Sequence, residues 1–220
     1  MDEPSKGKES LVLIDADGAG LEGVLSIPAG ATGIVLFAHG SGSSRLSPRN
    51  NFVAGVLREN GLATLLMDLL TGEEDRDYSM RFDIGLLTGR LEAATRWLKD
   101  NEDTAGLGIG YFGASTGAAA ALRAAVKMAP FIKAVVSRGG RTDMADETMR
   151  GVESPTLFIV GGSDDTVLKL NKKSFELLKC KKELKVVPGA THLFEEPGAL
   201  EEVAVLAADW FKKFLVHEAG

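Results

Sequence analysis

Cysteine and long apolar segments are scarce in this sequence. Cys180 is the only cysteine among 220 residues, so an internal disulfide is impossible and a reducing compartment is indicated. No apolar run reaches the roughly 18 residues of a membrane-spanning helix, and the polar start MDEPSKGKES lacks the basic and apolar parts of a secretory signal. We therefore expect a soluble, cytoplasmic protein without a membrane partner.

Positive charge and metal-ligand patterns are also in short supply. Lys and Arg number 25 against 31 Asp and Glu, for a net charge of -6, so no overall positive field attracts nucleic acid. The pairs Asp164-Asp165 and Glu195-Glu196 could attract a hard cation, but solvated surface explains them better. Neither nucleic acid, metal nor cofactor is predicted. The sequence contains no indication of the oligomeric state.

Hydrophobic residues make up 45% of the chain, enough for a sizeable core in one domain of ordinary size. We predict a polar tail over residues 1–9 and a single domain over residues 10–220. Apolar residues alternate on both sides of Asp17-Gly18, which predicts an N-terminal antiparallel hairpin. From residue 33 onward, short apolar runs alternate with helical patterns. This alternation indicates an α/β fold with a mostly parallel central sheet and helices on both faces.

The apolar runs and helix signals give approximate bounds for these elements. The expected strands occupy residues 34–38, 63–67, 107–112, 133–137, 156–160 and 184–187. The expected helices occupy residues 48–60, 83–99, 116–128, 171–179 and 200–215. Only 18 residues, 138–155, separate the fourth and fifth of these strands, which is too few for a separate lid domain.

A candidate nucleophile follows the strand expected over residues 107–112. The run Gly113-Ala114-Ser115-Thr116-Gly117 places a serine between small residues where a strand meets a helix. A nucleophile elbow needs small neighbours because it strains the backbone of the serine and brings the helix close to the sheet. Ser115 is the candidate nucleophile, and an ordinary βα turn is the alternative interpretation of the five residues alone.

An acid and a base follow in the chain order that this topology requires. Asp164 follows the apolar run PTLFIV in GGSDDTV, and His192 follows LKVVPG in GATH. Asp164 is the expected acid because it occupies the Asp position of GxxDxxV, whereas Asp165 should face solvent or cap the turn. His217 lies in the C-terminal tail, where contact with solvent or a helix end is the simpler role.

Backbone amides that hold an oxyanion are expected from two loops. The sequence HGSGS begins at His39, directly after an apolar strand, and its glycines let a backbone N–H point at the site. We predict that the N–H groups of Ser41 and Thr116 form the oxyanion hole, with Gly42 as a second candidate near the substrate. A rival hypothesis makes His39 the base and HGSGS a phosphate loop. A base ahead of the serine has the wrong order, and the spacing GxxxxGK[ST] is absent.

Arg138 and Arg141 begin the loop that follows the strand expected over residues 133–137. Ligands of open α/β sheets bind beyond the carboxyl ends of the strands, so both guanidinium groups are candidates to hold a substrate carboxylate. The alternative is that they pair with nearby acidic side chains and brace the loop, and this alternative is favoured. The acidic residues in question are Asp143, Asp146 and Glu147.

Together these motifs resemble the α/β-hydrolase superfamily, and within it the dienelactone-hydrolase-like group. The matching segments are FAHGSGSSRLSPRN, GYFGASTGAAAAL, VVSRGGR, FIVGGSDDTV and VPGATHLFEEPGALE. The resemblance implies a Ser115, Asp164 and His192 triad. Dienelactone hydrolases proper are expected to use a cysteine nucleophile, whereas the elbow here carries serine, so the resemblance is to a serine variant.

The expected activity is hydrolysis of carboxylic esters of small soluble substrates through an acyl-enzyme. A thioesterase, a lactonase or a small-peptide hydrolase would use the same triad. The competing hypothesis from another class is a non-catalytic α/β-hydrolase-fold protein that binds a ligand or partner. The presence of all three triad residue types favours the enzyme.

Overall fold

Eight strands form one sheet in the computed structural model, which describes residues 7–215. Their order across the sheet is β1-β2-β4-β3-β5-β6-β7-β8. The strands from β3 to β8 run parallel, while β2 pairs antiparallel with both β1 and β4. The strands are β1 Lys8–Ala16, β2 Ala19–Ile27, β3 Gly33–Ala38, β4 Ala63–Met67, β5 Gly108–Ala114, β6 Ile132–Arg138, β7 Thr156–Gly161 and β8 Lys182–Val187.

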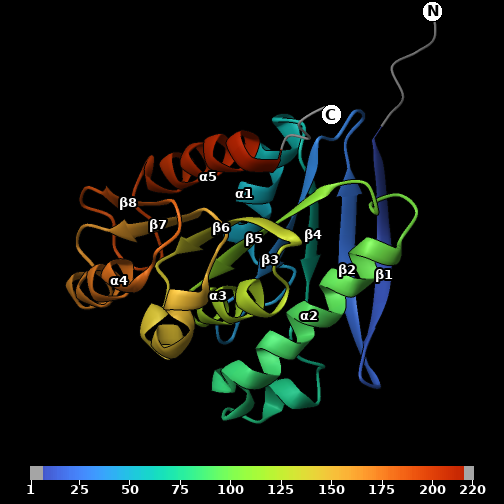
Figure 1. The fold of residues 1–220 in the computed structure, drawn as a ribbon, viewed down its shortest axis with the longest axis horizontal. Helices are drawn as coiled ribbons and strands as arrows, with labels where there is room; N and C mark the ends of the chain where they lie inside the picture. The colour runs from blue at the N-terminus through green and yellow to red at the C-terminus, as the bar shows by residue number, and fades with distance from the viewer. Residues whose placement is uncertain (1–6, 216–220) are drawn as a thin grey trace, which may run out of the picture.

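Helices cover both faces of this sheet, as Figure 1 shows. The helices are α1 Pro48–Glu59, α2 Ile84–Asp100, α3 Thr116–Lys127, α4 Asp165–Leu177 and α5 Ala199–Leu215, with short 3-10 segments η1 Glu74–Arg76, η2 Met80–Phe82 and η3 Thr142–Gly151. The apolar sides of α1 and α5 pack on one face in a core that includes Phe112 and Phe211. The apolar sides of α2 and α3 pack on the other face around Tyr111. The predicted α/β class is confirmed.

The N-terminal hairpin has the turn that its sequence predicts. Asp17 and Gly18 have φ of 56° and 86°, and the left-handed conformation at both positions suits a two-residue hairpin turn. The Asp15 carboxylate accepts a hydrogen bond from the Gly18 N–H at 2.8 Å. The strand β1 begins at Lys8, two residues before the predicted start of the domain.

Helix α4 differs most from its prediction. It spans Asp165–Leu177, whereas the sequence suggested residues 171–179. The Asp164 side chain accepts a hydrogen bond from the Val167 N–H at 3.3 Å and so caps the helix six residues earlier than expected. Cys180 lies three residues beyond the end of the helix.

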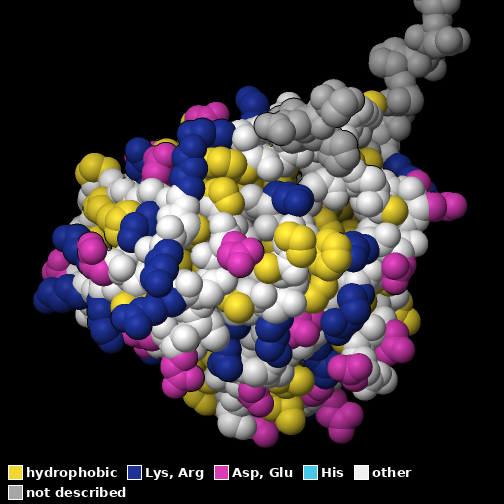
Figure 2. All heavy atoms as spheres, in the orientation of Figure 1, with side chains coloured by type: hydrophobic (Ala, Val, Ile, Leu, Met, Phe, Trp, Pro, Cys, Tyr) yellow, Lys and Arg dark blue, Asp and Glu magenta, His cyan; other side chains and the backbone are white. Residues whose placement is uncertain are grey.

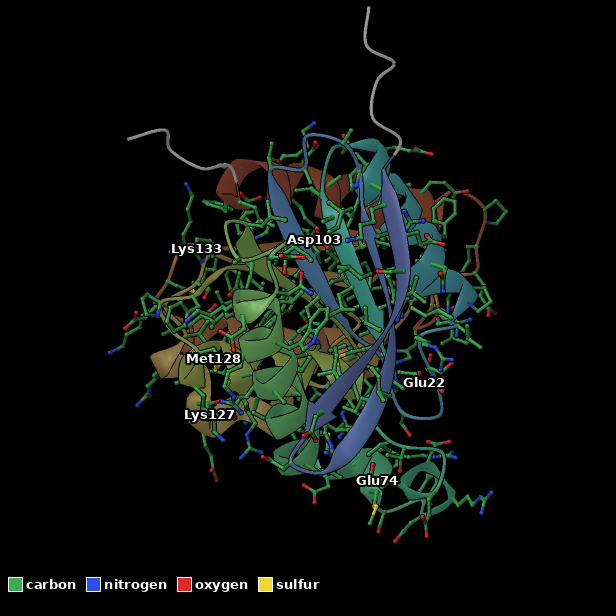
Figure 3. The ribbon with its side chains drawn as sticks, turned by 90° about the vertical axis from the view of Figure 1, so that its right-hand side faces the viewer. Glu22, Glu74, Asp103, Lys127, Met128 and Lys133 are labelled. Carbon is green, nitrogen blue, oxygen red and sulfur yellow. The ribbon has the colours of Figure 1, made fainter. Side chains whose placement is uncertain are left out.

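Helix α2 lies along the β1–β2 hairpin and is bound to it near both ends. Lys8 of β1 forms an ion pair with Asp103, just after the helix. Near the other end, Arg90 bonds the Ala16 carbonyl and the Glu74 carboxylate. Figure 3 labels Asp103 and Glu74 at opposite ends of this helix. These contacts hold the hairpin at the edge of the sheet next to β4.

Lysine side chains gather on the other edge of the sheet. Figure 2 shows dark blue side chains concentrated on the side where Figure 1 places α4 and β8. The edge strand β8 carries Lys182 and Lys185, a composition that discourages pairing with a further strand. Within residues 7–215, no helix has the length and hydropathy needed to cross a membrane.

Candidate active site

The C-terminal ends of the parallel strands bring together the side chains that the motifs singled out. Ser115 follows β5 at the centre of the sheet, and its backbone has φ 51° and ψ −119°. This strained conformation is rare for a residue with a side chain. It places Ser115 between the strand and α3, where the nucleophile elbow was predicted.

Glycine is required where α3 approaches the neighbouring strand. A Cβ added to Gly117 would lie 2.2 Å from the Ala38 carbonyl oxygen and 2.4 Å from that of His39. Real side chains do not tolerate such contacts with backbone atoms. The second glycine of the GASTG motif therefore allows the first turn of α3 to lie against the end of β3.

Asp164 and His192 are joined by a short hydrogen bond. His192 Nδ1 lies 2.7 Å from Asp164 Oδ2. Asp164 follows β7 and is 13% exposed in its side chain, while His192 follows β8 and is 37% exposed. Asp165, by contrast, is exposed at the first position of α4. Because Nδ1 is occupied by the carboxylate, Nε2 is the imidazole nitrogen that is left to act on a substrate.

Ser115, Asp164 and His192 line one open cleft of about 540 Å³. The cleft walls come from the β3 loop, η2, the elbow, the loop after β6, the start of α4 and the loop after β8. The remaining lining residues are Ser41, Phe82, Thr116, Arg141, Thr166, Val167 and Leu170. Sequence reasoning missed Phe82 and the α4 residues. The Asp164 cap followed by an apolar pattern was the signal that could have placed α4 beside the site.

The two predicted oxyanion donors are neighbours. Thr116 is 2% exposed, and its hydroxyl accepts a hydrogen bond from the Ser41 N–H at 2.9 Å. Ser41 and Thr116 both line the cleft that contains Ser115. Gly42, with φ +68°, lines an adjoining small pocket beside Arg81 rather than this cleft.

His39 is occupied elsewhere. Its Nε2 accepts a hydrogen bond from the Leu69 N–H at 2.9 Å, so the ring proton of the neutral form lies on Nδ1, which donates to the Gly40 carbonyl at 3.0 Å. Burial lowers the pKa of His39 and favours this neutral form. Both ring nitrogens of His39 are therefore hydrogen-bonded to backbone groups, which argues against His39 as the base.

The two arginines of the SRGGR segment lie in different surroundings. Arg141 lines the cleft, and its Nε and Nη2 each bond one oxygen of Asp143 at 2.9 Å, as the favoured alternative of a loop-bracing pair predicted. This bidentate pair lowers the pKa of Asp143. Arg138 is 8% exposed and is not among the residues that line the cleft. His217 lies outside the described residues.

The strained serine, the Asp164–His192 pair and the parallel sheet define a protein of the α/β-hydrolase fold, and comparison with known proteins agrees. The sequence profile of the dienelactone hydrolase family matches residues 21–216. The crystal structure of a dienelactone hydrolase from Anabaena variabilis is 54% identical, has a TM-score of 0.94, and covers 96% of this chain and 100% of that chain. Est1E from Butyrivibrio proteoclasticus, at 17% identity and a TM-score of 0.80, covers 92% of this chain and 98% of its own.

A longer relative comes from Mycobacterium tuberculosis, where it is provisionally named a phosphoribosyl transferase. It is 54% identical over 210 residues, which is 96% of this chain and 47% of the relative. The chain thus spans about half the length of this relative. The chain belongs to the dienelactone hydrolase family, and that family is one of hydrolases.

Proposed function

We propose that this chain hydrolyses carboxylic esters of small soluble substrates through an acyl-enzyme on Ser115. The observation that carries the proposal is the strained Ser115 backbone in one cleft with a hydrogen-bonded Asp164–His192 pair. A serine held at positive φ between a strand and a helix costs about 1 to 3 kcal/mol, and such strain clusters at active sites. Ser115, His192 and Asp164 are assigned as nucleophile, base and orienting acid.

The proposed first step forms a bond from Ser115 Oγ to the ester carbonyl carbon. His192 Nε2 takes the hydroxyl proton, and Asp164 holds the Nδ1 side of the ring so that the imidazolium is stabilised. The negative charge on the former carbonyl oxygen is received by backbone N–H groups. When the C–O bond to the leaving group breaks, His192 returns the proton to the alkoxide. Water, deprotonated by the same ring, then hydrolyses the acyl-enzyme.

The oxyanion hole is proposed to use the Ser41 and Thr116 N–H groups. Thr116 is the first residue of α3, so its N–H is unpaired within the helix and lies at the positive end of the helix dipole. The Ser41 N–H is engaged by the Thr116 hydroxyl in the free protein. An arriving oxyanion would compete with this hydroxyl for the Ser41 N–H.

The cleft supports small, soluble substrates. A 3-10 segment, η3, occupies most of the connection between β6 and β7, where a lid domain would be inserted. Esters, thioesters, lactones and small peptides share the same acyl chemistry, and carboxylic esters are the class we propose. Arg141 is proposed to favour acidic esters, since its Nη1 is not used in the bidentate pair with Asp143.

The transferase activity in the name of the mycobacterial relative is not part of the function we propose for this chain. The family match and the Anabaena protein, which is covered completely, both fall on the part of this chain that aligns with 47% of that relative. We infer that the matched part of that relative has the hydrolase fold and that this chain does not transfer phosphoribosyl groups. The purified chain should therefore release no pyrophosphate from phosphoribosyl diphosphate with purine or pyrimidine bases.

The test combines labelling and turnover. Wild-type protein, Ser115→Ala and the control Ser163→Ala are treated with a fluorophosphonate probe and assayed with p-nitrophenyl esters of increasing chain length, lactones and thioesters. Ser163 is exposed and lies beside Asp164, outside the cleft lining. Ser115→Ala should lose labelling and retain only about 10³ to 10⁴ of rate enhancement over water.

The outcomes separate the hypotheses. Wild-type labelling that survives in Ser163→Ala and disappears in Ser115→Ala supports the serine mechanism. Near-normal turnover in Ser115→Ala contradicts it. A wild-type protein that neither reacts with the probe nor hydrolyses any substrate of the panel would favour the non-catalytic binding protein. Faster turnover of thioesters than of matched oxygen esters would change the substrate class.

A further inference from the structure

Arg138 is a buried cation beside the active site that the proposed reaction does not use. It is the last residue of β6, and its carbonyl accepts a hydrogen bond from the Ser115 N–H at 3.2 Å. Its side chain belongs to the face of the sheet that α1 and α5 cover, where its guanidinium carbon lies 5.9 Å from the centre of the Phe194 ring. Arg138 is 8% exposed.

Within residues 7–215, the guanidinium group of Arg138 has no acidic partner. Its Nε and Nη1 atoms are buried and form no hydrogen bond with any residue in the described range 7–215. Burial lowers the pKa of Arg138 to about 10, and the positive charge of Arg49 adds to this effect. A buried charge is normally paired, as Arg90 is with Glu74 in this protein. Arg138 is therefore a cation for which the described chain supplies no anion.

Arg49, on the first turn of α1, provides a second guanidinium group, whose positive charge acts on Arg138. Its Nη1 bonds Glu195 at 3.0 Å, and the Glu195 side chain is 63% exposed. The Nε of Arg49 is buried and also has no hydrogen-bond partner within residues 7–215. The local set thus contains two guanidinium groups and one largely solvated carboxylate. Unused buried donors of positive charge favour an oxyanion ligand, because planar guanidinium forks match carboxylate and phosphate oxygens.

We propose that Arg138 and Arg49 form a binding site for a small oxyanion of the phosphate or carboxylate class, outside the Ser115 cleft. Neither arginine is among the residues that line that cleft, whereas Arg141 is. Phe194 and Glu195, which contact the two arginines, follow His192 by two and three residues. Phe194 also has φ +55°, an unusual conformation for an aromatic residue. A bound anion would fasten the His192 loop to β6 and α1.

The test measures anion binding without any need for turnover. Full-length protein is titrated calorimetrically with inorganic phosphate and with acetate, and its melting temperature is followed at constant ionic strength with chloride as the reference anion. At 100 times the dissociation constant, phosphate should raise the melting temperature by about 5 to 10 °C. The stronger of the two ligands identifies whether phosphate or carboxylate is the preferred oxyanion.

Four variants locate the site. Arg138→Met keeps the length of the aliphatic stem and removes the buried, unpaired charge, so it should melt no lower than wild type in chloride and lose the phosphate effect. Arg49→Gln, a change at the more exposed arginine, should weaken phosphate binding about tenfold or more. Arg141→Gln removes a cleft cation and should leave phosphate binding unchanged. Arg96→Met controls for net charge, because Arg96 lies on α2 and pairs with Glu92.

The proposal is supported if the effect of phosphate or acetate exceeds that of chloride and is lost in Arg138→Met and weakened in Arg49→Gln but kept in Arg141→Gln and Arg96→Met. It is overturned if neither oxyanion binds the wild-type protein more strongly than chloride does, or if binding survives in both Arg138→Met and Arg49→Gln. Loss in Arg141→Gln alone would place the anion in the cleft and also overturn it. Should Arg138→Met fail to fold, Arg49→Gln decides. None of these outcomes depends on ester hydrolysis.

Discussion

Replacing Asp164 with asparagine tests the proposed triad at the residue that does two tasks. One carboxylate oxygen accepts from the Val167 N–H at 3.3 Å and caps α4, and the other lies 2.7 Å from His192 Nδ1. Asparagine has a single acceptor oxygen, so it cannot serve both donors. Its amide must present oxygen to one of them and an NH₂ group to the other.

We expect the imidazole, and not the Val167 N–H, to change its hydrogen bond in this variant. A backbone N–H can only donate, so an amide NH₂ group facing Val167 in the Asp164→Asn variant would leave two donors in contact. An imidazole can move its proton from Nδ1 to Nε2 and accept from the NH₂ group instead. The ring is then held in the tautomer that cannot take the proton of Ser115. By analogy with the serine-protease triad, this change costs about 10⁴ in kcat.

Stability should change little, which separates this outcome from a folding defect. Asn and Asp are nearly equivalent helix caps, and a difference below about 1 kcal/mol corresponds to roughly 2 to 4 °C in melting temperature for a chain of this size. The assay is kcat/KM on the best p-nitrophenyl ester together with thermal unfolding. Asp165→Asn is the matched control, because Asp165 is exposed on the first turn of α4, and it should retain activity within a few-fold. Full activity with a lower melting temperature in Asp164→Asn would refute the reasoning, and reversed effects of the two variants would reassign the acid to Asp165.

Three further changes probe the nucleophile, the elbow and the cleft. Cys180→Ser should keep activity within a few-fold, because burial raises the pKa of this thiol, which lies outside the cleft near Thr156; a hundredfold loss would revive a cysteine mechanism. Gly117→Ala should destabilise the fold by about 1 to 3 kcal/mol or more in denaturant unfolding, since its Cβ would lie 2.2 Å from the Ala38 carbonyl oxygen, and unchanged stability would contradict this packing. Arg141→Gln should raise KM for acidic esters about tenfold over neutral esters. Because Arg141 lowers the pKa of Asp143, the pair stabilises the folded protein at pH values above 3.8, the ordinary pKa of the carboxyl group. This stability is lost as the pH falls through the lowered pKa. Wild type and Arg141→Gln should therefore converge in melting temperature at acidic pH.

Periodicity and end signals were sufficient for most of the fold. The predicted strand over residues 156–160 and the predicted helix over residues 48–60 each differ from the structure by one residue at one end. Fully buried apolar runs and the Ser47-Pro48 helix start are local signals, so they can be recognised in the sequence without knowledge of tertiary contacts. Helix α4 was misplaced because its start depends on the Asp164 cap, and the sequence analysis assigned that carboxylate only to His192.

The three triad candidates were predictable for a topological reason. Parallel strands end at one edge of the sheet, so residues just after β5, β7 and β8 must come close regardless of the details of the loops. The pocket itself was not predictable. Phe82 reaches the cleft from η2, a segment without periodicity, and its position depends on contacts such as the bonds from Arg81 to Asp75.

The two arginines of SRGGR show where such topological reasoning stops. Strand ends place Arg138 and Arg141 at the same edge, yet one side chain is buried on the α1–α5 face and the other lines the cleft. Arg138 still follows the alternation of β6, which directs it to the face of Ala134 and Val136. Beyond Arg138, Gly139 has φ +53° and lies close to the His192 ring, and the alternation of the strand ends there. The direction of Arg141 therefore depends on a glycine conformation, and no alternation rule extends past that turn.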